Sequence, residues 1–403
     1  MEAIHSRQAC VQASGSAQRG GRRPAPARRS AQHKARASCR RRGAGCLQRA
    51  AAQENVSTAP SDTIDWDSLG FSITNVAPFM FKATCRVHDP EAWVGGIEPY
   101  GPLEMMPSAQ VLNYGQAIFE GMKAQRSQKG NIVLFRPEKN AARMAGGAGR
   151  MSMQPIPEDV FVSAVESVVK ANAAFVPPAG KGALYLRPLL LGSAPILGLG
   201  PSEEFTFVVF AAPVGSYFKG GQLAPIDLVV ESRFHRSAPK GMGGTKAAGN
   251  YSPVLVTQLA AKKQGYADVI YLDARHEKYL EEVSSCNIFV VKGNTIKTPP
   301  TSGSILPGVT RASICELAKS LGFEVLEEAV SIDEALDADE IFTTGTAVVV
   351  SSVGSITHEG NKVEYCDGKV GPVTMQMYDR LTGIQSERYE DEFGWVRCVI
   401  ENA

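Results

Sequence analysis

Residues 241–251 read GMGGTKAAGNY, and residues 282–287 read EVSSCN. The first stretch places a lysine, Lys246, in a glycine-rich segment. The second places an isolated acid, Glu282, before a polar turn. Lysine amines attack aldehydes to form Schiff bases, and pyridoxal 5′-phosphate (PLP) is the common aldehyde cofactor. The two stretches together therefore favour an enzyme that binds such a cofactor.

The first fifty residues differ in composition from the rest of the chain. They contain eleven arginines and one lysine against a single acid, Glu2, whereas the whole chain of 403 residues has a net charge of +1. No apolar run long enough for a secretory signal follows these charges. We expect residues 1–55 to be an organelle transit peptide. It suits a plastid better than a mitochondrion, because it is long, rich in Ala and Arg, and lacks a clear amphipathic helix. The alternative is a basic arm for nucleic acid, but no aromatic residues interleave with the arginines.

The composition of the remaining chain argues against several classes of protein. It is net acidic, which disfavours non-specific binding to nucleic acid. It has no apolar run long enough for a transmembrane helix. Its cysteines and histidines are scattered, without a C-x-x-C or an H-E-x-x-H, so we expect no metal site and no dithiol redox pair.

The pattern of apolar residues predicts a mixed α/β protein with two domains. We expect a smaller α/β domain at 56–212, a linker at 213–221 that is rich in Gly, and a larger domain at 222–403. The expected strands are 131–135, 185–191, 205–211, 226–232, 268–273 and 287–292. The expected helices are 138–152, 157–174, 252–264, 310–321 and 373–387.

Three further segments are candidates for binding anions. ILPGVTR, residues 305–311, leaves free backbone N–H groups of Val309 and Thr310 at a helix start, although any helix begins this way. FTTGTA, residues 342–347, offers hydroxyls and a glycine to a phosphate or carboxylate, or else forms an ordinary β-turn. Arg187 lies within a strand, where an arginine pairs with a carboxylate of the protein or of a substrate.

Six motifs, in this order, resemble those of the branched-chain-amino-acid aminotransferases, which have PLP fold type IV. They occupy residues 112–124, 134–137, 184–188, 241–251, 282–287 and 306–311. The resemblance extends over roughly residues 65–400. It implies a two-domain architecture with the cofactor at the domain interface, which is a common place for ligands.

The resemblance also implies which residues hold the cofactor. Lys246 would form the Schiff base and move the proton between the substrate and the cofactor. Glu282 would face the pyridine nitrogen, and Tyr251 would bond the ring hydroxyl. The phosphate would be bound by Arg143, by the N–H groups of Val309 and Thr310, and by Thr346.

The substrate contacts follow from the same resemblance. The α-carboxylate would rest on the N–H groups of Thr346 and Ala347, and Arg187 would meet the γ-carboxylate of glutamate. Leu199 would reach in from a neighbouring subunit, which implies a homodimer. The apolar pocket would be lined by Tyr114, Phe119, Tyr185 and Tyr217.

The implied reaction is transfer of the amino group of L-leucine, L-isoleucine or L-valine to 2-oxoglutarate, giving branched-chain 2-oxo acids and L-glutamate by a ping-pong mechanism. The alternatives within the fold are a D-amino-acid aminotransferase and an aminodeoxychorismate lyase. A non-catalytic PLP-binding relative would lack Lys246, Glu282 or Arg143, and all three are present. Some relatives carry Cys-x-x-Cys where this chain has Val348 and Ser351, so a dithiol switch is excluded there.

Overall fold

The structure, a computed structural model, describes residues 57–73, 75–215, 222–301 and 303–403, without the side chains of residues 90–92. The described residues belong to one compact unit, Gly45–Ala403. The expected transit peptide and Tyr217 lie outside the described residues.

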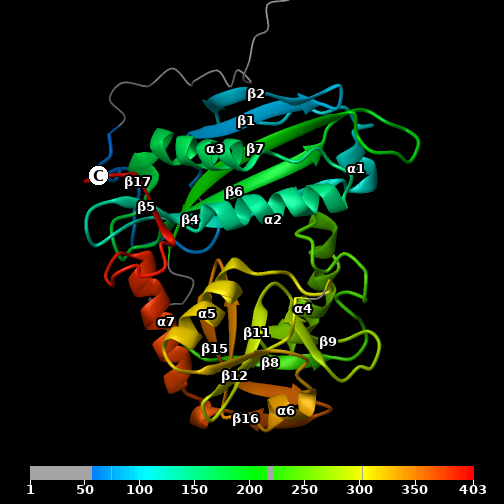
Figure 1. Ribbon diagram of the computed structural model, residues 1–403, viewed down its shortest axis with the longest axis vertical. Coiled ribbons are helices and arrows are strands. Elements are labelled where there is room, and N and C mark those ends of the chain that lie inside the picture. Colours follow the sequence, from blue (N-terminus) through cyan, green and yellow to red (C-terminus); the bar gives the residue numbers. More distant parts are fainter. Residues whose placement is uncertain (1–56, 74, 216–221, 302) are drawn as a thin grey trace, which may run out of the picture. The chain divides into compact units, whose positions relative to one another are not determined.

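The first sheet is antiparallel and has eight strands among the described residues (Figure 1). In spatial order they are β17 (Val396–Ile400), β5 (Ile132–Phe135), β4 (Met122–Arg126), β6 (Ala183–Gly192), β7 (Glu204–Val214), β1 (Phe79–Arg86) and β2 (Asp89–Pro99), with β3 (Ala117–Phe119) paired to β6.

Strand β6 shows how the sequence gives this sheet two different faces. Side chains alternate between the faces of a strand. Leu184 and Leu186 are completely buried, whereas Tyr185 and Arg187 between and after them are only partly buried. One face of β6 is therefore apolar core, and the other carries the residues expected to bind substrate.

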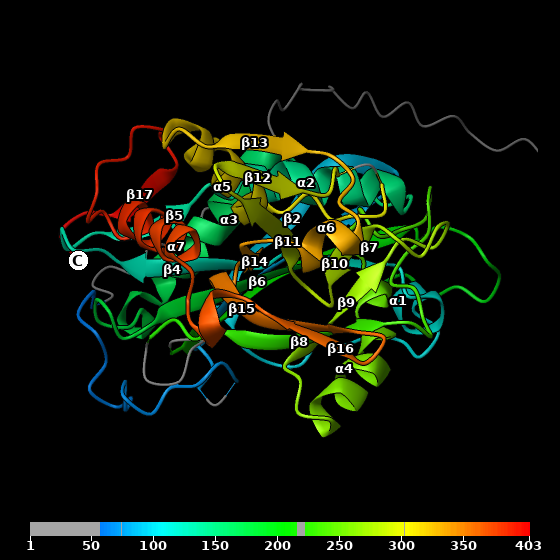
Figure 2. The ribbon, with the colours of Figure 1, turned by 90° about the horizontal axis from the view of Figure 1, so that it is seen from below.

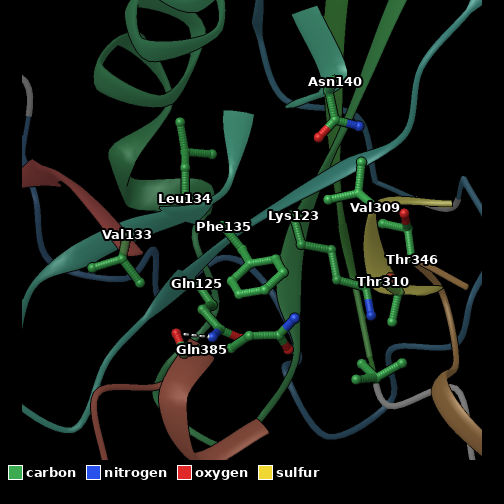
Figure 3. Close-up of a pocket in the computed structure, with 11 residues that line it drawn as sticks. Lys123, Gln125, Val133, Leu134, Phe135, Asn140, Val309, Thr310, Thr346 and Gln385 are labelled. Atoms are coloured by element: carbon green, nitrogen blue, oxygen red, sulfur yellow. Dashed lines mark hydrogen bonds between the residues drawn. The ribbon is translucent and has the colours of Figure 1, made fainter. Parts of the chain in front are cut away.

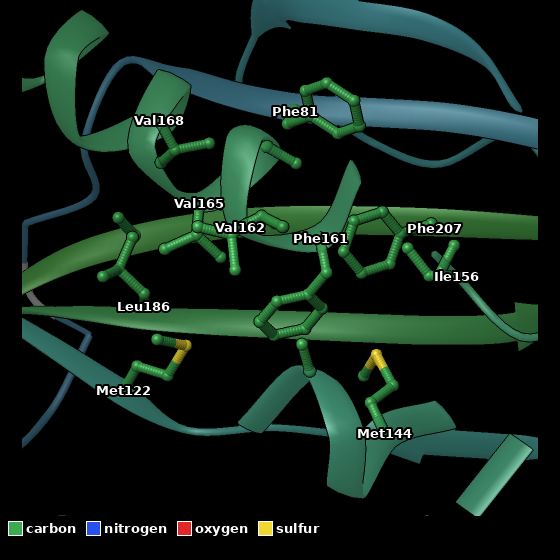
Figure 4. Close-up of a cluster of buried hydrophobic side chains, with 14 of the residues drawn as sticks. Phe81, Met122, Met144, Ile156, Phe161, Val162, Val165, Val168, Leu186 and Phe207 are labelled. Atoms are coloured by element: carbon green, nitrogen blue, oxygen red, sulfur yellow. The ribbon is translucent and has the colours of Figure 1, made fainter. Parts of the chain in front are cut away.

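Two helices, α2 (Pro137–Arg150) and α3 (Glu158–Ala171), lie against the apolar face of the first sheet (Figure 1). Valines three and four residues apart give α3 one buried side. Its Phe161 is in ring contact with Phe207 of β7, and Met144 of α2 lies in the same cluster (Figure 4). Each large apolar side chain buried in this way contributes about 1.5–3 kcal/mol to stability.

The second sheet is mixed and has nine strands among the described residues. In spatial order they are β10 (Leu280–Val283), β9 (Asp268–Leu272), β8 (Ile226–Glu231), β15 (Val349–His358), β14 (Glu340–Gly345), β11 (Asn287–Lys292), β12 (Thr295–Thr298) and β13 (Glu324–Glu327), with β16 (Asn361–Glu364) paired to β15. In Figure 2, β12 and β13 lie side by side at one edge.

The larger of the remaining helices pack against this second sheet. Helices α5 (Val309–Ser320) and α7 (Pro372–Gln385) share an apolar cluster with Phe289 and Phe342, whose rings stack at 4.9 Å. The other helical segments are α1 (Gln110–Tyr114), α4 (Val254–Lys263), α6 (Ile332–Leu336), η1 (Ala173–Phe175), η3 (Ala248–Asn250) and η4 (Cys366–Gly368). None of the described helices is long and apolar enough to cross a membrane.

The strands and helices expected from the sequence are confirmed, with bounds that differ by only a few residues. The sequence did not predict the remaining strands, which include the long strands β1, β2 and β15 as well as the last strand, β17. That strand returns from the C-terminal part of the chain to pair with β5 in the first sheet. The domain bounds stay a prediction, because most of the expected linker, residues 216–221, lies outside the described residues.

Candidate active site

The lysine loop follows β8 and is tied to both sheets. Ile118 of β3 bridges to Ala247, and the N–H of Phe119 donates to the carbonyl of Lys246 at 3.1 Å. Asn250 donates from Nδ2 to the carbonyls of Met242 and Thr245, at 2.7 and 2.9 Å. The Asn250 of the motif therefore closes the loop on itself and fixes the lysine between two sheets.

The Lys246 amine lies among aromatic rings. Its Nζ donates to Tyr251 Oη at 3.0 Å and lies 4.7 Å from the centre of the Phe119 ring. The rings of Phe119 and Tyr251 meet edge to face at 4.8 Å. The structure thus brings together three of the residues that the sequence assigned to one site.

Glu282 lies at the end of β10, where it is 2% exposed. It forms an ion pair with Arg236, and its Oε1 accepts a hydrogen bond from Asn287 at 2.8 Å. Burial raises the pKa of Glu282 to about 7, while the charges of Arg236 and Lys246 act in the opposite direction. Glu282 is therefore close to Lys246, and its carboxyl group titrates near neutral pH.

Arg143 projects from α2 and pairs with a completely buried acid, Glu120. Its Nε and Nη2 donate to the two carboxylate oxygens of Glu120 at 2.7 and 2.6 Å, and its Nη1 donates to the Pro307 carbonyl at 3.0 Å. Burial disfavours the charge, but Glu120 outweighs it and raises the pKa of Arg143. The guanidinium is held beside the segment that leads into α5.

The N-terminus of α5 is free of side-chain caps. Gly308 is the N-cap residue, and no side chain accepts a hydrogen bond from the first turn. A Cβ at Gly308 would overlap Oδ1 of Asn287, so glycine is required by this close approach. The backbone N–H groups of Val309 and Thr310 therefore retain the anion-binding character of a helix start.

A turn between β14 and β15 carries Thr346 and Ala347. Thr346 Oγ1 donates to the Gly121 carbonyl at 3.2 Å, and Lys123 Nζ donates to the Ala347 carbonyl at 2.7 Å. Burial lowers the pKa of Lys123 to about 8. The ammonium of the partly buried Lys123 thus lies beside the turn whose N–H groups were expected to bind a carboxylate.

A small cavity of about 40 Å³ joins this turn to the start of α5 (Figure 3). Lys123 extends into it, and Val309, Thr310 and Thr346 line the same wall. The two candidate anion sites, at the helix and at the turn, are therefore neighbours, and Lys123 lines the cavity that they share.

The partly buried face of β6 presents Arg187 between two aromatic rings. Its guanidinium carbon lies 4.9 Å from the centre of the Phe119 ring and 5.4 Å from that of Tyr185. Nη2 donates to Tyr185 Oη at 3.3 Å, and Nε is buried without a partner in the described structure. A Cβ at Gly121 would overlap the Tyr185 hydroxyl, which explains the glycine beside it.

The described structure shows no contact of Tyr114 or Leu199 with Lys246 of the same chain. Tyr114 is at the end of α1, and its hydroxyl donates to the Leu197 carbonyl at 2.6 Å. Leu199 belongs to the same loop and is 86% exposed. Tyr217 lies outside the described residues.

The sequence reasoning missed four polar residues of the site: Glu120, Lys123, Arg236 and Asn287. Two of them, Glu120 and Lys123, are charged residues in or beside apolar strands. A charge in such a strand is the sequence signal that could have identified them. No cluster of His, Cys, Asp or Glu in the described part of the chain is placed to hold a metal ion.

The residues present fit a phosphorylated pyridine aldehyde. An amine, Lys246, a buried acid, Glu282, and an uncapped helix start with Arg143 beside it are the groups that such a cofactor needs. The charge of Glu282 acts on both Lys246 and Arg143, so all these groups share one site.

Comparison with known proteins agrees with this chemistry. Residues 117–356 match the amino-transferase class IV family. A branched-chain amino acid aminotransferase 2, chloroplastic, from Humulus lupulus is 55% identical over 333 residues, which is 82% of this chain and 81% of that protein.

Two solved structures share the fold. The Escherichia coli branched-chain amino acid aminotransferase has a TM-score of 0.70 and 29% identity, over 80% of this chain and 99% of that one. The T.th. branched-chain amino acid aminotransferase, solved with pyridoxamine 5′-phosphate, has a TM-score of 0.69 and 26% identity, with the same coverage.

Proposed function

We propose that this chain, which belongs to the class IV aminotransferases and to their branched-chain-amino-acid group, transfers the amino group of L-leucine, L-isoleucine and L-valine to 2-oxoglutarate. The cofactor of the family is PLP. When bound, PLP supplies an aldehyde for amines and a ring that accepts electrons from the substrate Cα.

Lys246 is the proposed catalytic residue. Its Nζ would hold the cofactor at rest, then take the proton from the substrate Cα and deliver it to the carbon of the cofactor that carried the aldehyde. The contact with Tyr251 Oη at 3.0 Å and the position over Phe119 support this role, because they hold the amine at one point. Tyr251 would also bond the ring hydroxyl of the cofactor.

Glu282 is proposed to keep the ring nitrogen of the cofactor protonated. Arg236 and Asn287 hold its carboxylate, and a pKa of about 7 means that it takes or gives a proton near neutral pH. At the other end of the cofactor, the phosphate would be held by Arg143, Thr346 and the N–H groups of Val309 and Thr310.

The substrate α-carboxylate is proposed to bind the N–H groups of Thr346 and Ala347. Lys123 supports this assignment, because its ammonium is bonded to the Ala347 carbonyl and so adds positive charge beside the turn. The position of the turn is held from β4, to which Lys123 belongs.

One observation supports the choice of substrates best: the Arg187 guanidinium lies between the rings of Phe119 and Tyr185, with a buried unpaired Nε. The ring faces offer apolar surface to a branched alkyl chain, and the guanidinium offers a cation to the γ-carboxylate of glutamate. One pocket could then accept both substrates of a ping-pong reaction.

A homodimer is proposed from the loop that contains Leu197 and Leu199. These side chains are 91% and 86% exposed, which is unusual for neighbouring leucines. The hydroxyl of Tyr114 stabilises this loop by donating a hydrogen bond to the Leu197 carbonyl. In a second copy, Leu199 would complete the apolar pocket, so Leu199→Ser should weaken leucine binding without changing PLP binding.

The plastid location expected from residues 1–55 agrees with the chloroplastic relative. We also propose that residues 56–212 and 222–403 act as two domains with the cofactor between them. The contacts from β3 and β4 to the lysine loop and the β14–β15 turn support a site built from both parts.

The test is an absorbance spectrum of the purified protein loaded with PLP, before and after L-leucine. The visible cofactor band should disappear with L-leucine and return with 2-oxoglutarate. Lys246→Ala should abolish both changes. Lys240→Ala, at an exposed lysine six positions earlier, is the control and should leave them intact. A response to D-alanine but not to L-leucine would favour the D-amino-acid alternative instead.

A further inference from the structure

A further carboxylate, that of Asp268 at the start of β9, is partly buried on the strand that pairs with the strand of Glu282, and it has no part in the proposed reaction. It accepts hydrogen bonds from Ser284 Oγ at 2.5 Å, from the N–H of Val269 at 2.9 Å and from Gln258 at 3.3 Å. Burial raises the pKa of Asp268, with the hydrogen bond from Ser284 acting against the rise. A partly buried carboxylate is stabilised by such hydrogen bonds, and the one from Ser284 is the shortest of the three and the one that reaches the segment of Glu282.

Ser284 connects Asp268 to the segment that contains Glu282. It is 1% exposed and lies two residues after Glu282, in a turn closed by the hydrogen bond from the N–H of Val283 to the carbonyl of Cys286 at 3.0 Å. The hydroxyl of Ser284 points to Asp268, while its carbonyl accepts a hydrogen bond from Arg236 Nε at 3.4 Å. The same arginine then pairs with Glu282.

The guanidinium of Arg236 is planar and rigid, so the direction of its Nη1 depends on where its Nε is anchored. Its side chain is only 2% exposed, and little water is available to replace a lost partner. A bond of 3.4 Å from Nε is at the long end of the range, and a small movement of the Ser284 carbonyl would break it.

We propose that Asp268 and Ser284 are positioning residues for Glu282. Their hydrogen bond holds the turn whose carbonyl orients Arg236, and Arg236 orients the Glu282 carboxylate. The inference rests on the proposed function, in which Glu282 meets the ring nitrogen of PLP.

The groups that face Glu282 show why the alignment of Arg236 matters. They come from every segment around it and are Arg236, Lys246, Glu281, Asn287, the N–H of Leu306 and, through its charge, Arg143. Among these cations only Arg236 is in direct contact with the carboxylate in the described part of the chain. If it turns away, protonation of Glu282 becomes easier, and a protonated acid no longer stabilises a charged ring nitrogen.

The experiment measures the equilibrium dissociation constant of PLP as a function of pH, with the enzyme stripped of PLP and reloaded. In the wild type, affinity should fall as the pH is lowered through about 7. Ser284→Ala should weaken PLP binding at pH 7 about three- to tenfold, the loss expected for one hydrogen bond of ordinary strength, and should move the midpoint to higher pH.

Two substitutions of Asp268 separate hydrogen bonding from charge. Asp268→Asn keeps an oxygen that accepts from Ser284, so its PLP affinity should stay within about twofold of the wild type. Asp268→Leu removes the acceptor and should reproduce Ser284→Ala. If Asp268→Asn behaves like Ser284→Ala, then the carboxylate acts through its charge, and the positioning role is wrong.

A matched control lies in the same sheet. Ser355 of β15 donates to Asp227 at 2.6 Å and is completely buried, so Ser355→Ala removes the same kind of bond elsewhere. It should lower the melting temperature as Ser284→Ala does, but leave the pH profile of PLP binding unchanged. Identical profiles for the two alanine variants would overturn the inference.

Glu282→Gln distinguishes failure of this inference from failure of the proposed function. It should abolish the change of PLP affinity near pH 7. If the pH dependence survives in Glu282→Gln, then Glu282 does not serve the ring nitrogen and that part of the proposed function fails. If the pH dependence of PLP affinity disappears in Glu282→Gln but is unchanged in Ser284→Ala, only the positioning role of Asp268 and Ser284 is wrong.

Discussion

Lys123 and Ala347 are 224 positions apart in the sequence, and a hydrogen bond of 2.7 Å joins the amine of the first to the carbonyl of the second. The lysine belongs to the first sheet and the alanine to a turn of the second. This bond links the two sheets at the point where we propose that the substrate carboxylate binds. It also places a partly buried positive charge there.

Lys123→Met should therefore raise the KM for L-leucine about tenfold, because a hydrogen bond to a charged group is worth about 1.5 kcal/mol or more. PLP affinity should change much less. Initial rates and PLP titrations on the same preparations would separate the two effects. Lys82→Met, at a half-exposed lysine of β1, is the control and should change neither.

The same lysine predicts a pH effect. The pKa of Lys123 is lowered to about 8, so its charge is present at neutral pH and lost as the pH rises through about 8. Binding of a monocarboxylate inhibitor should weaken over that range in the wild type, and more weakly or not at all in Lys123→Met. An equal pH dependence in both proteins would contradict a role for the Lys123 charge.

Much of the fold follows from the sequence, because alternating apolar residues and Gly or Pro breaks are local signals. They sufficed for β6, α3 and α5. The return of β17 to β5 had no such signal, since short strands of mixed composition resemble loops and their partners lie far away in the sequence.

The residues of the site also fall into those that the sequence could predict and those that it could not. Lys246 and Glu282 could be predicted from their motifs, and the structure brings them together. Their partners could not, because a buried ion pair such as Arg236 with Glu282 depends on tertiary packing between segments that are distant in the chain. The spacing of residues along a sequence does not show which charges will be neutralised.

Arg187→Leu should separate the two half-reactions. Loss of the guanidinium should weaken the reaction with 2-oxoglutarate about a hundredfold, which corresponds to about 3 kcal/mol for a charge-assisted contact. The reaction with L-leucine should change far less, since the aromatic rings of Phe119 and Tyr185 remain. Single-turnover measurements with each substrate would test this, and an equal loss for both would contradict the assignment.

Glu120→Gln tests the buried ion pair with Arg143. The side chains are 0% and 9% exposed, and loss of one partner leaves a buried charge unpaired. The free energy of unfolding should fall by about 3–5 kcal/mol. Glu204→Gln removes the partner of the exposed Arg86 and should cost at most about 1 kcal/mol. Urea unfolding of both variants would show the difference, and similar losses would argue against a structural role for the buried pair.

Glu282 also predicts how the stability of the protein without PLP depends on pH. Its pKa in the folded protein is about 7, above its ordinary value of 4.5. Between these values the folded state binds more protons than the unfolded state, so the contribution of Glu282 to stability decreases as the pH rises through this window. The melting temperature of the wild type should therefore fall, relative to Glu282→Gln, between about pH 5 and pH 8. Glu334→Gln is the control, because the pKa of Glu334 is lowered and its titration lies below this window. If the melting temperatures of the wild type and Glu282→Gln depend on pH in the same way, then Glu282 does not titrate between about pH 5 and pH 8. Its proposed role at the ring nitrogen would then require a carboxylate that stays ionised over this whole pH range.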